Sequence, residues 1–366
     1  MLIINRYIIL EIIKPMVVMF AVLVILFAAY STMHYLEDAV YGLMPVSTVM
    51  KLILLKITIS LEVLLPITLY LSVIVGLGRL YKDGEMTALF ASGLGLGRVL
   101  TVVFTLSLLV SLLVASLSLW ARPKAYERSF WLKAKAKAEF DFTRLKAGRF
   151  YEIGEGNQII FINKIDPQGK RAEGVFIQKE SKDEGGMLEV VYAKEARHHL
   201  DPSTGRQVIL FLDGCAYEFP HTGKEGWSAV EFGQFTRSLW PKEITPIEYK
   251  IKAASSIHLG RSQAPSDIAE LQWRLSAPLS TILLALLGVP LSRTVPHEGK
   301  YPKMATAMFI FAIYYGMGSV AKILVEQGVV PPLPGIWWVQ GLLTGLLLAL
   351  LHHPSQQFWP SRKRRN

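Results

Sequence analysis

Apolar residues gather in six long runs, which divide the chain into two sets of three. The runs cover residues 16–33, 53–78, 99–120, 275–291, 305–323 and 337–351. Each is close to the roughly 20 residues that a helix needs to cross about 30 Å of hydrocarbon. The fourth run contains Pro278 and Pro290, whose freed backbone groups neighbouring helices can satisfy. The pattern predicts a membrane α-helical protein with six transmembrane helices in a 3+3 arrangement.

The basic residues between these runs fall on one side of the six crossings. They precede the first run, separate the second from the third and the fourth from the fifth, and close the chain: Arg6, Lys14, Arg79, Lys82, Arg98, Arg293, Lys300, Lys303, Arg362, Lys363, Arg364 and Arg365. The first loop on the opposite side, residues 34–50, contains Glu37 and Asp38 and no Lys or Arg. Because cytoplasmic loops carry the excess of basic residues, we expect both termini in the cytoplasm.

The segment between the third and fourth runs has a different pattern, and the same topology places it outside the cytoplasm. Short stretches rich in β-branched and aromatic residues cover 149–153, 158–162, 174–178, 189–193, 207–212 and 229–235. Turn signals separate them at 154–157, 167–169, 185–186, 201–205 and 213–214. We therefore expect an inserted all-β domain, for which both a sandwich and an open barrel fit.

Three domains follow from this organisation: an N-terminal transmembrane half at 1–122, an extracytoplasmic domain at 123–262 and a C-terminal transmembrane half at 263–366. Residues 122–140 are expected to form an interfacial helix at the start of the middle domain. Its basic and aromatic residues are Lys124, Lys133, Lys135, Lys137 and Trp131, with Trp120 just before it. A solvated linker helix and a contact for lipid head groups are both consistent with this composition.

Composition supports the membrane interpretation. Of the 366 residues, 51% are hydrophobic, and the mean hydropathy is +0.34. A net charge of +10 would by itself suggest nucleic-acid binding, but the basic residues flank apolar runs. We interpret them as topology determinants and expect no nucleic-acid partner. Arg6 and Lys14 lead into a long apolar run without a small-residue cleavage site, so we expect no cleaved signal.

Motifs for catalysis and cofactor binding are absent from the sequence. The nearest fragment of a phosphate loop, Gly299-Lys300-Tyr301, lacks the upstream glycine and the hydroxyl. The glycines of residues 93–97 follow no strand and suit helix packing. The single cysteine, Cys215, excludes an intramolecular disulfide. The pairs His198-His199 and His352-His353 lack an acidic cluster that would complete a metal site. We expect no metal, no cofactor and no enzymatic activity of its own.

Residues 80–93, on the cytoplasmic side, are predicted to form a short amphipathic helix. Met86, Leu89 and Phe90 are spaced i, i+3, i+4, and Ser92-Gly93 ends the segment. Its apolar face would either dock into a groove on a partner or rest on the bilayer.

Several segments resemble the LptF/LptG (YjgP/YjgQ) family of lipopolysaccharide-export permeases. They are residues 4–8 (INRYI) with Glu11 and Lys14, residues 77–81 (LGRLY) with Glu85 and 91–93 (ASG), and 120–123 (WARP). Residues 269–275 (AELQWRL) and 289–292 (VPLS) are similar to the LptF branch. The resemblance covers both membrane halves and is weak within the insert.

The resemblance implies a function. Family members pair as an LptF–LptG heterodimer on a dimer of the ATPase LptB, so ATP would be hydrolysed by a partner subunit. The complex would extract lipopolysaccharide from the outer leaflet of the inner membrane and pass it through β-jellyroll domains to LptC and LptA. The insert would then be a periplasmic β-jellyroll-like domain. Residues 80–93 would be the coupling helix, with Glu85 at the acidic position and Met86, Leu89 and Phe90 on the docking face.

The resemblance also implies where the substrate binds. The first and fifth helices would line an apolar cavity through residues 21–27 and 308–315, including Phe27 and Tyr315. Lys322 matches a family lysine for the lipid phosphates, although its spacing also permits a pair with Glu326. The first helix carries Ser31 and His34 where the family often has basic residues, so His34 would contribute only when protonated. Within the insert, Phe161 and Phe211 are candidate lipid contacts.

Glu62 lies inside the second apolar run, where a carboxylate is a functional candidate. We favour a structural ion pair for it, with Lys51 or with a base on a partner subunit. Two alternative functions remain open at this point. One is an ion-driven secondary transporter with Glu62 as the proton carrier. The other is a membrane sensor or mechanotransmission subunit.

Overall fold

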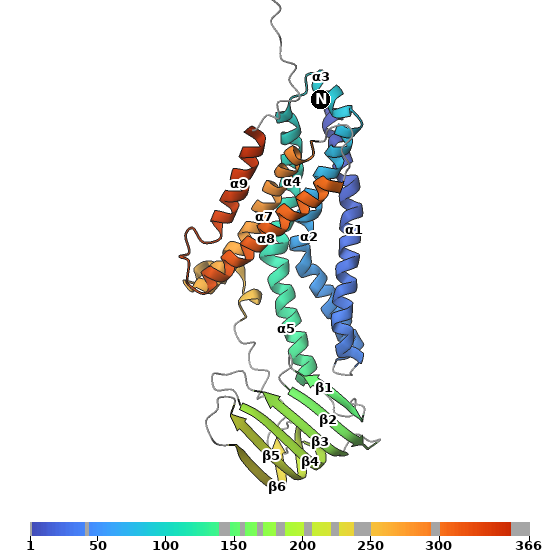
Figure 1. Cartoon of the computed structure of the whole chain (residues 1–366), viewed down its shortest axis with the longest axis vertical. Coiled ribbons are helices and arrows are strands. Elements are labelled where there is room, and N and C mark those ends of the chain that lie inside the picture. Colours follow the sequence, from blue (N-terminus) through green and yellow to red (C-terminus); the bar gives the residue numbers. More distant parts are fainter. Residues whose placement is uncertain are drawn as a thin grey trace, which may run out of the picture. The chain divides into compact units, whose positions relative to one another are not determined.

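The computed structural model of the full chain describes residues 2–40, 44–138, 147–153, 158–166, 171–180, 187–200, 207–220, 227–237, 250–293 and 301–352. These residues belong to two compact units (Figure 1). The helical unit comprises 1–32, 52–130 and 248–366, and the sheet unit comprises 33–51 and 131–247. The predicted basic residues at 300 and 362–365 lie outside the described part of the chain.

Helices occupy all six predicted apolar runs. The helices are α1 (Leu2–Val40), α2 (Val46–Lys82), α3 (Glu85–Ala91), α4 (Leu96–Ser116), α5 (Arg122–Ala138), α6 (Ser256–Arg261), α7 (Pro265–Leu291), α8 (Tyr301–Glu326) and α9 (Trp337–His352). A π-helical turn, Leu117–Ala121, joins α4 to α5 without a break, so the predicted interfacial segment continues a long helix.

Five of these helical segments are long and apolar enough to cross a membrane. They are Ile3–Met33, Val46–Lys82, Leu96–Ala136, Pro265–Leu291 and Met304–Glu326. Helix α9 is apolar but has only 16 residues, fewer than the roughly 20 needed for a full crossing. The sixth crossing, and with it the 3+3 count, stays a prediction.

Helix α7 continues through both of its prolines, as the sequence predicts. Pro278 has no N–H, which frees the carbonyl of Arg274 four residues earlier. The hydroxyl of Ser118, on the π-helical turn, lies 3.1 Å from this carbonyl oxygen and 2.8 Å from Glu62 Oε1, and its one proton is shared between these two acceptors. Ser111 of α4 also donates to the carbonyl of Pro278, at 2.9 Å. The neighbouring helix therefore satisfies the backbone where the proline interrupts it.

Helices α1 and α2 approach each other closely at Gly76. A Cβ atom there would lie 2.7 Å from the backbone oxygen of Glu11, so only glycine fits. One turn further along α2, Arg79 Nη1 lies 2.6 Å from Glu11 Oε1. The glycine thus brings the two helices near enough for this ion pair to form across them.

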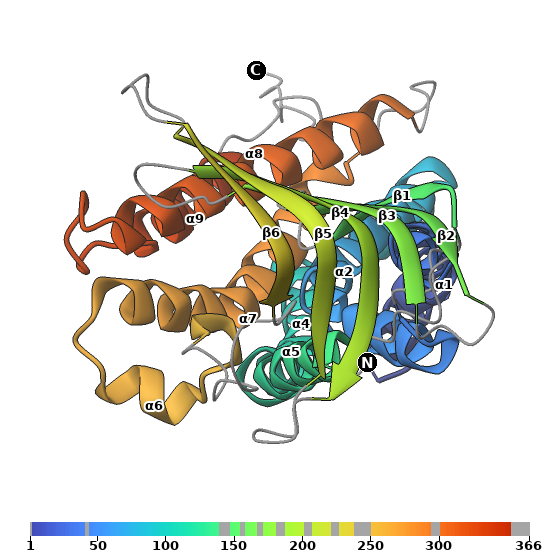
Figure 2. The same cartoon turned by 90° about the horizontal axis from the view of Figure 1, so that it is seen from below.

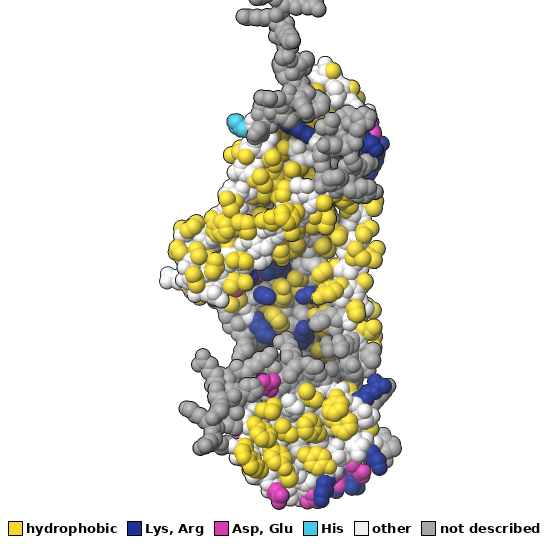
Figure 3. Space-filling model, viewed as in Figure 1, with side chains coloured by type: hydrophobic (Ala, Val, Ile, Leu, Met, Phe, Trp, Pro, Cys, Tyr) yellow, Lys and Arg dark blue, Asp and Glu magenta, His cyan; other side chains and the backbone are white. Residues whose placement is uncertain are grey.

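Much of the surface of the helical unit is apolar (Figure 3). Helix α1 is one of its parts: only 6% of its most apolar window is buried within the chain, and Val18, Ile25 and Tyr30 are at least 64% exposed. Water-facing helices expose such surfaces rarely, whereas lipid or a second membrane subunit can cover them.

The sheet unit is a six-stranded antiparallel meander with the strand order β1-β2-β3-β4-β5-β6. The strands are β1 (Arg149–Ile153), β2 (Gln158–Ile165), β3 (Arg171–Glu180), β4 (Met187–Leu200), β5 (Gln207–Pro220) and β6 (Ser228–Arg237). Each of the six predicted stretches lies within one of them, so the predicted all-β insert is confirmed. The described strands form one sheet and not the two facing sheets of a sandwich. A jellyroll-like arrangement stays a prediction.

The sheet curves (Figure 2) because its strands share a line of irregular positions. Asn163, Gly174, Lys194, Asp213 and Gly233 occupy equivalent places in β2 to β6 of the strand register. Gly174 and Asp213 have positive φ angles of 63° and 50° there.

Side-chain alternation shifts by one residue across this line, as β4 illustrates. Val191 and Ala193 are buried before it, and Ala196 is buried after it. The same face of the sheet is therefore apolar on both sides of the bend, and the two halves enclose one hydrophobic interior.

One predicted turn is wrong. Asp213-Gly214 does not end a strand but lies in the middle of β5. Asp and Gly tolerate the positive φ angles that hairpin turns require. Here Asp213 adopts such an angle inside a strand, where the sheet bends.

We predict that Gly76→Ala weakens the helical unit, because its new methyl group forces α1 and α2 apart. The expected loss is about 1–3 kcal/mol of unfolding free energy, which is the usual cost of overpacking. Gly341→Ala is the control, since no heavy atom lies within 4 Å of the added Cβ and alanine favours a helix. Thermal unfolding in mild detergent compares the two, and equal midpoints would contradict the close packing.

Candidate functional site: a charged cluster beside an apolar pocket

Six charged side chains meet inside the helical unit. They are Glu62 of α2, Arg122 at the start of α5, Glu270 and Arg274 of α7, and Lys322 and Glu326 of α8. Four helices therefore contribute to one cluster, which we call the charged cluster. Charged groups in such apolar surroundings are retained only when they are paired.

Glu270 lies at the centre of the charged cluster and is fully buried. Its Oε1 lies 3.1 Å from Arg122 Nη1 and 3.1 Å from Arg274 Nε. Its Oε2 lies 2.6 Å from Lys322 Nζ. Glu270 and Arg274 are four residues apart on α7, which brings both to one helix face. A single carboxylate thus holds α5, α7 and α8 together.

Arg274 is also fully buried and connects α7 to the segment that leads into α6, including the first residue of that helix. Its Nη1 donates to the carbonyl of Ala254 at 2.9 Å and to Ser256 Oγ at 3.0 Å. Its Nη2 donates to the carbonyl of Lys252 at 3.2 Å. The rigid guanidinium fork can reach three acceptors on this segment, which a lysine could not do in the same geometry.

Glu62 completes the buried part of the charged cluster. Its Oε2 lies 3.1 Å from Arg122 Nε, and Ser118 donates to its Oε1 at 2.8 Å. The predicted structural ion pair is confirmed, but the partner is Arg122 and not Lys51. The carboxylate is only 4% exposed, so the interior fixes its position.

The charged cluster consists of an inner set of four side chains and an outer pair, and each set has no net charge. Glu62 and Glu270 are neutralised by Arg122 and Arg274, and the side chains of all four are at most 6% exposed. Lys322 and Glu326, 3.5 Å apart, have side chains that are 13% and 33% exposed. Lys322 is therefore not needed to neutralise the two most buried carboxylates, although it binds one of them.

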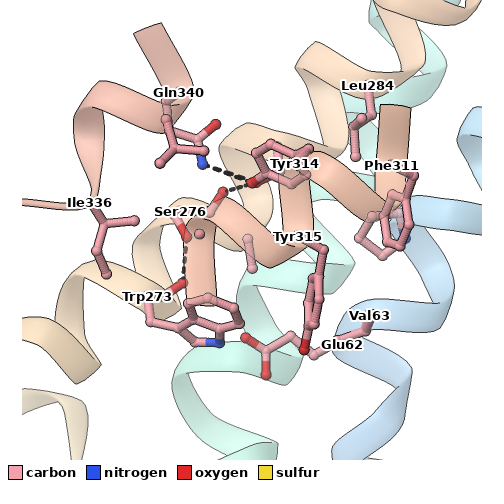
Figure 4. Close-up of a pocket in the computed structure, with 15 residues that line it drawn as sticks. Glu62, Val63, Trp273, Ser276, Leu284, Phe311, Tyr314, Tyr315, Ile336 and Gln340 are labelled. Carbon is pink, nitrogen blue, oxygen red and sulfur yellow. Dashed lines mark hydrogen bonds between the residues drawn. The ribbon is translucent and has the colours of Figure 1, made fainter. Parts of the chain in front are cut away.

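An apolar pocket of about 40 Å3 adjoins the charged cluster (Figure 4). Residues of α2, α7, α8 and α9 line it, and Glu62 and Trp273 lie at the boundary between pocket and cluster. Figure 4 shows the Glu62 carboxylate pointing toward Trp273 and Tyr315. The Trp273 and Tyr315 rings meet edge to face at 5.6 Å, and Lys322 Nζ lies 5.5 Å from the centre of the Trp273 ring.

Residues 6–353 match the family described as "Lipopolysaccharide export system permease LptF/LptG". The chain belongs to this family. It is 24% identical over 356 residues to "Lipopolysaccharide export system permease protein LptF" of Escherichia coli strain K12, covering 95% of this chain and 94% of that protein. The protein of the same name from Shigella flexneri gives the same values. The chain is thus a membrane-embedded permease subunit for lipopolysaccharide transport, and not itself the catalytic subunit.

The structure brings together two of the substrate residues expected for an LptF/LptG permease. Lys322 belongs to the charged cluster and pairs with Glu326 as the spacing predicts, while Tyr315 lines the pocket. Phe27 lies on α1, where its ring contacts Tyr30 at 6.4 Å, and it is not among the pocket residues. The side chain of His34 lies outside the described side chains.

The two candidate lipid contacts in the sheet unit lie on opposite faces. Phe211 is 1% exposed and belongs to the hydrophobic interior with Ile160 and Ile162. Phe161 stands between these two isoleucines, so the alternation of a strand points it to the other face. There it packs against Phe150 at 4.7 Å. The two phenylalanines therefore do not share one surface of the sheet, and their role as lipid contacts stays a prediction.

Helix α3 forms within the predicted coupling segment, but its apolar face is already occupied. Met86 is fully buried in the same core as Ile8, Leu77 and Val99. Leu89 and Phe90 are half-buried against this core. These three side chains hold α3 on the body of the permease, because burying apolar area within the chain is favourable. Met86 is thus buried within the chain itself, and the docking role of this segment stays a prediction.

Glu85 lies at the start of α3 and accepts a hydrogen bond from the hydroxyl of Tyr7 on α1. The residues that α3 exposes are Thr87, Ala88 and Ala91. This surface, together with Glu85, is the part of the segment that a partner could contact.

Sequence reasoning missed Arg122, Glu270 and Arg274 as site residues. All three fall within segments that carry the family resemblance, residues 120–123 and 269–275, yet no role follows from that resemblance alone. The available signal was the presence of charges at helical spacing within or beside apolar runs. The contact between Arg122 and Glu270 joins positions more than 140 residues apart, which one sequence does not reveal.

We predict that Glu270→Gln destabilises the helical unit by about 3–5 kcal/mol, since it leaves the buried Arg274 without its carboxylate partner. Glu326→Gln is the matched control, because its partner Lys322 is the same and its side chain is 33% exposed. The control should change stability by no more than about 1 kcal/mol. The stability of both purified variants is measured from their unfolding midpoints in mild detergent. If Glu326→Gln lost as much stability as Glu270→Gln, the central role of Glu270 would be contradicted.

Proposed function

We propose that this chain is the LptF-type subunit of an ABC-type exporter that extracts lipopolysaccharide from the outer leaflet of the inner membrane. An LptG-like permease would be its heterodimer partner, and a dimer of an LptB-like ATPase would hydrolyse ATP. The chain would need no cofactor of its own. Both termini would lie in the cytoplasm and the sheet unit in the periplasm, as the distribution of basic residues indicates.

The observation that carries this proposal is Lys322, a cation in an apolar helical unit whose charge the buried arginines and carboxylates do not require. Phosphate groups on a lipid head need such a cation at the membrane interface. A phosphate would replace the partly exposed carboxylate of Glu326 as the partner of Lys322. Glu270 would keep the ammonium group in place during the exchange.

The exposed apolar surface supports the same function. Met308, Phe309 and Ile313 of α8 are at least 46% exposed, and α1 is exposed along most of its length. Acyl chains are as apolar as these side chains, so they can move from the bilayer to such a surface without a large change in free energy. We propose that α1, including Phe27, and α8 line a cavity between the two permease subunits.

The sheet unit would receive the lipid after extraction. Its two halves enclose an apolar interior that includes Phe211, and an edge strand can pair with a strand of a following protein. We propose that acyl chains enter this interior and pass on to LptC-like and LptA-like proteins.

The ion-driven alternative has less support. A proton carrier must lose and regain its proton during transport, whereas Glu62 is held by Arg122 and Ser118. Copurification separates export from a sensor role, because export requires a second permease subunit and an ATPase in one complex.

Reconstitution tests the whole proposal. The chain is purified with its copurifying subunits, inserted into proteoliposomes loaded with lipopolysaccharide, and supplied with ATP and a soluble acceptor. We expect lipopolysaccharide to reach the acceptor only when ATP is hydrolysed. Transfer that follows an ion gradient in the absence of ATP would refute an ATP-driven permease.

We predict that Glu85→Lys abolishes ATP-driven transfer while the subunit still inserts and folds, because the charge that α3 offers to the ATPase is reversed. Tyr7→Phe is the control, since it removes only the hydrogen bond to Glu85 and leaves the carboxylate. Transport and ATP hydrolysis are measured for both variants. Normal coupling in Glu85→Lys would remove the coupling role from this residue.

We predict that a photo-crosslinking residue at position 211 captures lipopolysaccharide only during ATP hydrolysis. The same residue at position 161 should capture none, because Phe161 lies on the opposite face of β2 from the interior. Immunoblotting for lipopolysaccharide adducts compares the two sites. Equal capture at both would show that lipid does not enter through the apolar face of the sheet.

A further inference from the structure

The ten residues between α8 and α9, 327–336, form an apolar loop (Figure 1). Seven of them are Val, Leu, Ile or Pro, and no Asp, Glu, Lys or Arg occurs from Gln327 to His352. Val329 and Leu333 are 67% and 78% exposed within the chain. Loops that face water are typically rich in Ser, Thr, Asn, Asp and Gly, so this loop has the composition of a surface that something apolar covers.

Helix α9 is too short to cross the hydrocarbon by itself. Its 16 residues rise about 24 Å, whereas the hydrocarbon of a bilayer is about 30 Å thick. At one end of the apolar run stand His352 and His353, and at the other end the uncharged sequence continues into the loop. Helix α8, which leads into the loop, includes a candidate membrane span, Met304–Glu326. The missing length of the sixth crossing, about 6 Å, therefore falls on the loop.

The backbone of the loop suits surroundings that contain little water. A bilayer tolerates non-helical backbone only where protein groups satisfy its hydrogen bonds. Three of the ten loop residues are prolines, which have no N–H to satisfy. The N–H groups of residues 327–330 donate to carbonyl oxygens of the last turn of α8, at 3.0–3.2 Å. The first half of the loop thus needs no water as an acceptor for these groups.

Gln272 of α7 holds the second half of the loop. Its Nε2 donates to the carbonyl of Pro332 at 2.6 Å, and its Oε1 accepts from the N–H of Ile336 at 3.1 Å. Gly335 has a φ angle of 51°, and a Cβ there would collide with the Gln272 amide. Eight of the ten loop positions therefore have either no N–H or an acceptor for it within the protein. The loop is fixed on α7 while Leu333 stays exposed.

We infer that residues 327–336 insert into the bilayer, where head groups meet acyl chains, and complete the sixth crossing together with α9. The lipid of one leaflet covers the exposed surface of the loop, and in the proposed topology this is the outer leaflet. Val329 and Leu333 lie among the first carbons of the acyl chains. Trp337 and Trp338, which begin α9, fit this depth, because tryptophan is enriched where lipid meets water.

The inserted loop acts as an anchor for the end of α8. Lys322 lies one helical turn before Glu326, the last residue of that helix. An anchored loop therefore fixes how deep Lys322 lies in the membrane. The insertion itself does not depend on export, and only the use of this depth for a transported lipid rests on the proposed function.

A fluorescent amino acid at position 333 tests the insertion. Because Leu333 is 78% exposed within the chain, its replacement removes little internal packing. The same amino acid at positions 342 and 348 of α9, where the leucines are 55% and 53% exposed, gives the lipid-facing references. Position 173 on β3, where the Glu173 side chain is 53% exposed, gives the water-facing reference. Each full chain is reconstituted with its copurifying subunits in phospholipid vesicles without ATP.

Two quenchers then report the surroundings of the fluorophore. Phospholipids brominated near the head-group end of the acyl chain quench from the hydrocarbon, and iodide quenches from water. We expect the brominated lipid to quench position 333 as it quenches the α9 references, and iodide to quench it several-fold less than position 173. Iodide quenching equal to that at position 173 would overturn the insertion. Protection from both quenchers would also overturn it, because a protein and not lipid would then cover the loop.

Gln272→Ala tests whether Gln272 holds the loop in place. Losing its two hydrogen bonds to the loop should raise iodide quenching at position 333 several-fold. Gln340→Ala is the matched control, because Gln340 bonds to Ser280 and Tyr314 instead. Equal quenching in the two variants would overturn the role of Gln272. Because quenching needs no ATP, a complex whose loop inserts but that fails to transfer lipopolysaccharide would reject the export proposal and leave the insertion intact.

Discussion

The buried carboxylate of Glu270 is the interaction on which the helical unit depends most. An ionised group in an apolar interior is tolerated only when opposite charges and hydrogen bonds replace water, and three cations from three helices do so here. The same requirement fixes the position of Arg274. Its remaining donors bind the carbonyls of Lys252 and Ala254, which lie just before α6 in the sequence. A polar cluster of this kind specifies which helices meet, whereas apolar packing alone would permit many arrangements.

The need to pair buried charges distinguishes the residues with a structural role from Lys322, whose charge the buried residues do not require. Two glutamates and two arginines neutralise each other in the interior, and Lys322 and Glu326 form an outer pair with more exposure. Under the proposed function, a lipid phosphate would replace Glu326 as the partner of Lys322 without leaving the inner carboxylates unpaired. The exposed faces of α1 and α8 offer the apolar surface that acyl chains prefer.

The sheet unit meets a different constraint, which is to keep one apolar face continuous around a bend. Its strands shift their alternation together at one line of positions, where Gly174 and Asp213 adopt positive φ angles. The bend gives a single sheet an enclosed interior that otherwise requires a second sheet. Phe211 contributes to this interior. Phe161 lies between the interior residues Ile160 and Ile162 on β2, so it contributes to the outer face.

The sequence by itself determined the positions of the helices and strands, because long apolar runs and period-two stretches are local signals. The family resemblance likewise came from short segments of the sequence. Tertiary structure alone decided which partner each charge has: Glu62 pairs with Arg122, 60 residues away, and not with Lys51 on its own helix. It also decided that Met86 faces the permease's own core and that Asp213 bends a strand instead of ending it. Periodicity reveals that a face is apolar, but what covers that face depends on contacts between distant segments, and those form only when the chain is folded.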